Sequence, residues 1–123
     1  MPSSPQSAPD VFTLFNLRVS IDPRSTNIIG KHVVGDYFDV IGEDIFLPEG
    51  QGFSLYALAS ILPLLPAKQR KNHPNDFMET DDLIADPDVN SGAVYHIART
   101  GETVFRHSEV SGNVLPSSPS HHA

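Results

Sequence analysis

A Leu-rich segment, Ser54–Gln69, constrains the fold of this chain more than any other feature. Its apolar residues recur every three or four positions, which is the spacing of one face of an α-helix. These residues are Leu55, Leu58, Ala59, Leu62 and Leu65. Ser54 is a favourable N-cap, because its hydroxyl can accept a backbone N–H from the first turn. The segment therefore predicts a buried helix that begins at Ser54.

Two further properties of this segment limit how it can pack. Pro63 lacks the N–H of the helical ladder and clashes with the preceding turn, so the helix should kink or break near Ala59. The flanks are apolar too, at Tyr56, Ile61 and Leu64. One small sheet cannot easily cover a helix that is apolar nearly all round. We therefore expect a homo-oligomer, in which a second copy covers the rest.

Strand patterns occur on both sides of the helical segment, where apolar and polar residues alternate or turn residues bound a short apolar run. They are Val11–Ile21, Tyr37–Ile41, Glu43–Leu47 and Leu83–Ala85. Near the C-terminus, Ala93–Arg99 and Glu102–His107 flank Thr100 and Gly101, which suit a two-residue hairpin turn. The predicted fold is α+β, with a small antiparallel sheet and a C-terminal β-hairpin packed on one Leu-rich, proline-kinked helical segment.

Composition limits the number of domains and the classes of partner. The chain has 123 residues, and its Ser/Pro-rich ends predict disordered tails at 1–10 and 111–123 around a single domain at 11–110. The net charge of −7 argues against a nucleic-acid partner, which requires a basic face. The absence of cysteine excludes thiolate chemistry. The longest apolar run, Leu55–Leu65, is too short to span a membrane, so we expect a soluble cytoplasmic protein with no membrane partner.

Histidines and acids near the C-terminus form the first candidate site. The predicted hairpin places His96 and His107 on one face at diagonal positions, where they could share acid–base work or bind a metal. A metal needs a third ligand, which no spaced motif supplies, and both histidines could instead be structural. Pro87 fixes the backbone between Asp86 and Asp88, so one carboxylate could be held at the mouth of the core. A solvated acidic surface is the alternative.

The start of the helical segment is the second candidate site. Gly52 lets the backbone approach a ligand, and the free N–H groups at a helix start attract anions. A carboxylate or phenolate could bind at Gly52, Phe53 and Ser54, with Phe53 and Tyr56 as an aromatic wall. Ordinary helix capping by Ser54 is the alternative explanation.

Three short motifs follow one another in a distinctive order along about half of the chain. They are Val34–Phe38, the glycine-led helix with an internal proline at Gly52–Leu65, and Asp86-Pro87-Asp88 followed by Ala93–Ile97. The stretch from about Val34 to Arg99 thereby resembles a family of small, mostly uncharacterised α+β proteins, described only as an uncharacterised repeat family. The resemblance implies a compact α+β fold. Members often carry cysteines where this chain has Ser54 and a residue near Ala85, so a thiol-dependent role is not expected to transfer.

Three functions remain open from the sequence. The first, which we favour, is a small cofactor-independent lyase, decarboxylase or isomerase acting on a small aromatic or polyketide-like acid. In it His96 or His107 would move a proton, and Asp86 or Asp88 would orient the histidine. The second is a non-catalytic oligomeric binding or assembly module. The third is a metal-dependent enzyme that uses His96 and His107.

Overall fold

The computed structural model describes residues 10–116 and contains one five-stranded antiparallel sheet with strand order β3-β2-β1-β5-β4. The strands are β1 (Val11–Ile21), β2 (Tyr37–Ile41), β3 (Asp44–Phe46), β4 (Leu83–Ala85) and β5 (Val94–Arg106). The helices are α1 (Leu55–Ile61), the 3₁₀ turn η2 (Leu62–Leu64), α2 (Leu65–Lys68), α3 (Phe77–Thr80) and α4 (His107–Val110). The predicted α+β class is confirmed.

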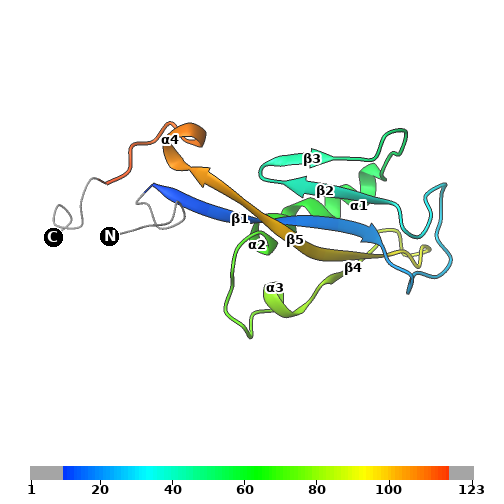
Figure 1. Cartoon of the computed structure of the whole chain (residues 1–123). Helices are drawn as coiled ribbons and strands as arrows, with labels where there is room; N and C mark the ends of the chain where they lie inside the picture. Colours follow the sequence, from blue (N-terminus) through cyan, green and yellow to red (C-terminus); the bar gives the residue numbers. More distant parts are fainter. Residues whose placement is uncertain (1–9, 117–123) are drawn as a thin grey trace.

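The two long strands, β1 and β5, form the centre of the sheet and run side by side across the molecule (Figure 1). Alternation along β1 buries Leu17, Val19 and Ile21, as its sequence pattern predicts. These residues join a core made with β2, β5 and one side of the helical segment. Its other buried members are Phe38, Val40, Ala57, Ile61, Leu65, Ala93, Tyr95 and Ile97.

The helical segment begins where the sequence predicts, and it breaks slightly later than the predicted position near Ala59. Ser54 is the N-cap of α1, and its Oγ accepts a hydrogen bond from the Ala57 amide at 3.2 Å. Pro63 falls within η2, so the α-helix stops at Ile61 and resumes as the single turn α2. Ile61, before the break, and Leu65, after it, are both buried in the core.

Burial of the helical segment is one-sided in the single chain, so the sheet does not cover this helix all round. Leu55 and Tyr56 are 72% and 77% exposed, and Leu62 is also exposed. The sheet covers only the side that carries Ala57 and Ile61. An apolar strip of α1 and η2 therefore faces away from the core.

The predicted C-terminal hairpin is wrong, because Val94–Arg106 is one continuous strand. Leu17 pairs with Arg99 and Asn16 pairs with Gly101, so the intervening Thr100 is the extra residue of a β-bulge. The eleven residues of β1 offer a backbone partner along the whole length of β5. A hairpin would have left the first half of β1 without a partner.

Beyond the bulge, the start of β1 and the end of β5 pair only with each other and form a two-stranded arm that carries α4 (Figure 1). The Phe12 and Phe105 rings stack across this arm, with centroids 5.2 Å apart. The predicted disordered tails fall largely on residues 1–9 and 117–123, which lie outside the described residues. Asp10 belongs to the arm, because its carboxylate pairs with Arg106 at 2.8 Å. Across 10–116, no helix has the length and apolar character that crossing a membrane requires.

Candidate functional site

A pocket of about 630 Å³ lies where β1 ends and β5 begins, next to α1. Ile21, Ile28 and Ile29 contribute an apolar wall from β1 and the loop after it. Polar side chains from separate parts of the chain also line the wall, among them His32, Ser54, Asp86, Asp88 and Tyr95. Mostly apolar pockets of this size with a few convergent polar groups are typical of small-molecule sites.

The most specific contact in the pocket joins Tyr95 to Asp86. The Tyr95 hydroxyl donates a hydrogen bond of 2.5 Å to the Asp86 Oδ2, and Tyr95 itself is only 3% exposed. Burial raises the pKa of Tyr95, and the hydrogen bond to Asp86 raises it further. The phenol therefore stays protonated and acts as a donor. The other carboxylate oxygen of Asp86 accepts the Asp88 amide at 2.8 Å, across Pro87.

His32 supplies the only imidazole that lines this pocket among the described residues. Its Nδ1 lies 3.5 Å from the Asp36 Oδ2, and its ring stacks on Phe53 with centroids 6.2 Å apart. Phe53 also contacts Tyr95, with centroids 5.7 Å apart. The ring of His32 is thus held between an acid and an aromatic side chain. Sequence reasoning missed this residue, because it lies in a loop without periodicity.

Several residues predicted from the sequence meet at this pocket. Asp86, Asp88, Ser54 and Tyr56 all line it, although they come from distant parts of the chain. Gly52 is adjacent, since a Cβ built there would lie 3.9 Å from the His32 ring, and Phe53 forms the aromatic support described above. The Ser54 hydroxyl, however, caps α1.

The predicted pairing of His96 with His107 is wrong. Because β5 is extended, their separation of eleven residues corresponds to roughly 35 Å at about 3.3 Å per residue. His96 Nε2 instead lies 2.9 Å from Asp82 Oδ2, and His107 Nε2 lies 2.8 Å from the Asn113 carbonyl. The two imidazoles cannot share one substrate or one metal ion. Their same-face geometry required the hairpin that does not form.

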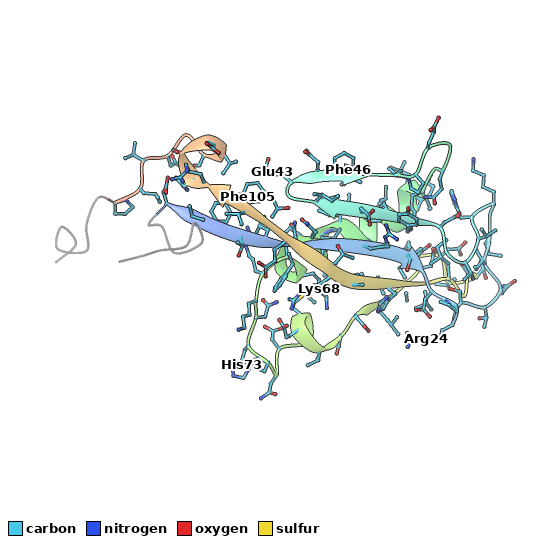
Figure 2. All side chains as sticks on the ribbon, in the orientation of Figure 1. Arg24, Glu43, Phe46, Lys68, His73 and Phe105 are labelled. Carbon is cyan, nitrogen blue, oxygen red and sulfur yellow. The ribbon has the colours of Figure 1, made fainter. Side chains whose placement is uncertain are left out.

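The acidic residues that precede β4 have structural partners. Glu79 forms a bidentate pair with Arg99, at 2.6 and 3.1 Å, and the Arg99 guanidinium lies 4.2 Å from the Phe15 ring centroid. Lys68, labelled near the centre of Figure 2, is buried and donates from Nζ to the Asp81 carbonyl. Within residues 10–116 no group of three or more histidine, aspartate or glutamate side chains is arranged to hold a metal ion.

Comparison of the chain with protein-family models, with curated proteins and with solved structures found no match. The likeness of residues 34–99 to the uncharacterised repeat family therefore stays a prediction. The pocket beside α1 is the feature on which a function can be based.

Proposed function

We propose that this protein is a small enzyme of isomerase type, which transfers a proton within a small, largely apolar substrate held in the pocket beside α1. The observation that carries the proposal is the 2.5 Å hydrogen bond from the buried Tyr95 to Asp86, in the wall of an apolar pocket that also contains His32. Acid–base catalysis needs a group that exchanges protons near neutral pH, and histidine is the usual one.

Each polar residue has a distinct role in this proposal. His32 takes a proton from one substrate atom through Nε2 and returns it to another, because Nδ1 is directed to Asp36. Asp86, fixed by Tyr95 and by the Asp88 amide, is a preorganised acceptor that orients the substrate. The reaction rearranges one substrate, so no electron acceptor or donor takes part. His32 thereby replaces His96 and His107 in the role that the sequence predicts for them.

The test is a proton-exchange assay in D₂O on small aryl ketones, some of which carry an amino group. NMR detects the uptake of deuterium at the carbon next to the carbonyl. We expect the protein to accelerate exchange in some of these compounds. The variant His32→Gln should lose at least about 100-fold of that acceleration. The control His73→Gln changes an exposed histidine on the loop between α2 and α3 (Figure 2) and should keep full activity. Equal rates for His32→Gln and the unmodified protein would contradict the proposal.

The second candidate function is a non-catalytic oligomeric assembly module. The exposed apolar side chains of Leu55, Tyr56 and Leu62 on α1 and η2 support it. Sedimentation velocity should then show a homo-oligomer that dissociates in the double variant Leu55→Ser, Leu62→Ser. The control Val89→Ser changes an apolar side chain that is 95% exposed in the loop before β5 and should leave the assembly intact. A monomer at all accessible concentrations would eliminate this candidate.

A further inference from the structure

The charged groups around the pocket beside α1 are unevenly distributed. Asp86 and Asp88 line it, and within the described part of the chain no lysine or arginine does. The one basic side chain that can face a ligand is His32, and it already lies 3.5 Å from Asp36. The pocket is therefore acidic as well as apolar.

Arginines elsewhere in the molecule neutralise the acids that they contact. Four such pairs occur in the described chain, namely Arg18 with Asp39, Arg24 with Asp22, Arg99 with Glu79 and Arg106 with Asp10. Over residues 10–116, by contrast, neither Asp86 nor Asp88 forms an ion pair. Asp86 accepts from Tyr95 and from a backbone amide, and Asp88 accepts from the Asn90 amide at 2.9 Å. These donors fix the two carboxylates without cancelling their charge.

A ligand with a positively charged polar end can neutralise the charge that Asp86 and Asp88 keep. An ammonium group can approach the free lone pairs of Asp86 and Asp88, while its apolar body lies against the isoleucine wall. A carboxylate in the same place would meet two like charges. We infer that the pocket binds small amines with an apolar or aromatic body, in preference to the aromatic acid expected from the sequence. This inference rests on the proposed substrate role of the pocket.

The experiment compares three ligands of nearly equal shape, which are 2-phenylethylamine, 2-phenylethanol and phenylacetate. Binding to the full chain is measured at pH 7 by chemical-shift titration. We expect the amine to bind at least about tenfold more tightly than phenylacetate, with the alcohol in between. Added salt should reduce the advantage of the amine, because part of the attraction is Coulombic.

A pair of isosteric variants assigns the effect to the pocket. Asp88→Asn keeps the acceptor for the Asn90 amide but removes one charge, so it should lower amine affinity severalfold and leave the affinity for 2-phenylethanol unchanged. Asp44→Asn removes the same charge from the exposed edge strand β3 and should change neither affinity. If Asp88→Asn and Asp44→Asn lower amine affinity equally, the preference for amines comes from the net charge of the protein and not from the pocket, and the inference is overturned.

The outcomes separate the ligand class from the function of the pocket. If 2-phenylethanol binds as tightly as the amine, or if phenylacetate binds most tightly, the amine inference is overturned while the pocket stays a binding site. If none of the three ligands shifts the resonances of Tyr95 or Ile28, the proposed function fails together with the inference.

Discussion

Gly92, which follows the pocket residue Ser91, is the glycine of the described chain that is least tolerant of an added Cβ. It forms a bridge with Thr26, in which the Thr26 amide donates to the Gly92 carbonyl at 3.0 Å. A Cβ on Gly92 would overlap the Thr26 carbonyl, which is backbone and cannot rotate away. We expect Gly92→Ala to lower the free energy of unfolding by more than about 2 kcal/mol, measured by urea denaturation.

The control for Gly92 is Gly101→Ala at the bulge. A Cβ there would lie 3.8 Å from the Asn16 side chain, an ordinary contact, so stability should change by less than about 0.5 kcal/mol. If Gly92→Ala and Gly101→Ala lose the same stability, the close approach of the Gly92 backbone to Thr26 is not the cause of the stability loss in Gly92→Ala.

Glu79 makes stability depend on acid pH. Hydrogen bonds from Arg99, followed by one from the Asn72 amide, lower the pKa of Glu79 to about 2 from the usual 4.5. Because the folded-state pKa is lower than the unfolded one, the contribution is complete above pH 4.5 and declines as the pH falls toward 2. We expect Glu79→Gln to be less stable at pH 6 and to show a shallower loss of stability between pH 5 and 3, measured from urea midpoints. Parallel pH profiles for the variant and the unmodified protein would contradict this role.

At the residue scale, local chemistry predicts part of the candidate site. Asp86 and Asp88 stand out because Pro87 fixes the backbone between them, and Ser54 because it caps a helix. Tyr95 and His32 could not be identified in this way. The role of Tyr95 depends on pairing between β4 and β5, which brings Asp86 beside it, and His32 is positioned by a long loop. Such contacts between distant residues leave no local pattern.

At the element scale, Gln69 attaches the end of α2 to the bulged region of the sheet. Its side chain is buried, and its Nε2 donates to the Gly42 carbonyl at 2.8 Å, while its own carbonyl accepts the Phe15 amide at 2.8 Å. Gln69→Leu keeps the volume but leaves the Gly42 carbonyl without that donor. We expect a loss of about 1–3 kcal/mol in the free energy of unfolding, measured by urea denaturation.

The matched control places the same leucine two positions later, where Lys71 is exposed. Lys71→Leu should change stability by less than about 0.5 kcal/mol. If Gln69→Leu is equally harmless, the hydrogen bond to Gly42 does not hold α2 against the sheet.

Strand and helix positions were predictable where a single element carries its own pattern. The bounds of β1, β2 and β4 agree with the predicted strands, and the break at Pro63 follows from proline chemistry. The error at Thr100 and Gly101 has a physical reason. A hairpin turn and a β-bulge both accept a small residue between two segments of alternating apolar and polar residues. The length of the neighbouring strand β1 decides which of the two forms. That length becomes decisive once β1 and β5 are known to pair.

At the scale of the whole molecule, the sheet divides into a covered body and an arm. In the body, β1 is paired on both sides, with β2 and β5, over Leu17–Ser20. In the arm, residues 11–16 and 101–106 form strand pairs only with each other, and the Phe15 amide at its base donates to the Gln69 carbonyl. A two-stranded ribbon is marginally stable by itself, since few of its side chains are covered. Phe12 and Val104, both exposed, illustrate this for the arm.

Hydrogen exchange should therefore distinguish the arm from the body. We expect the backbone amides of 11–14 and 101–106 to exchange through local opening, at least about tenfold faster than those of 17–21 and 94–99. The body amides should exchange only when the core unfolds, and so should follow the stability loss in Gly92→Ala, whereas the arm amides should not. Peptide-resolved mass spectrometry of exchange in both proteins measures this. Equal protection along the whole of β5 would mean that the arm and the body open as one cooperative unit.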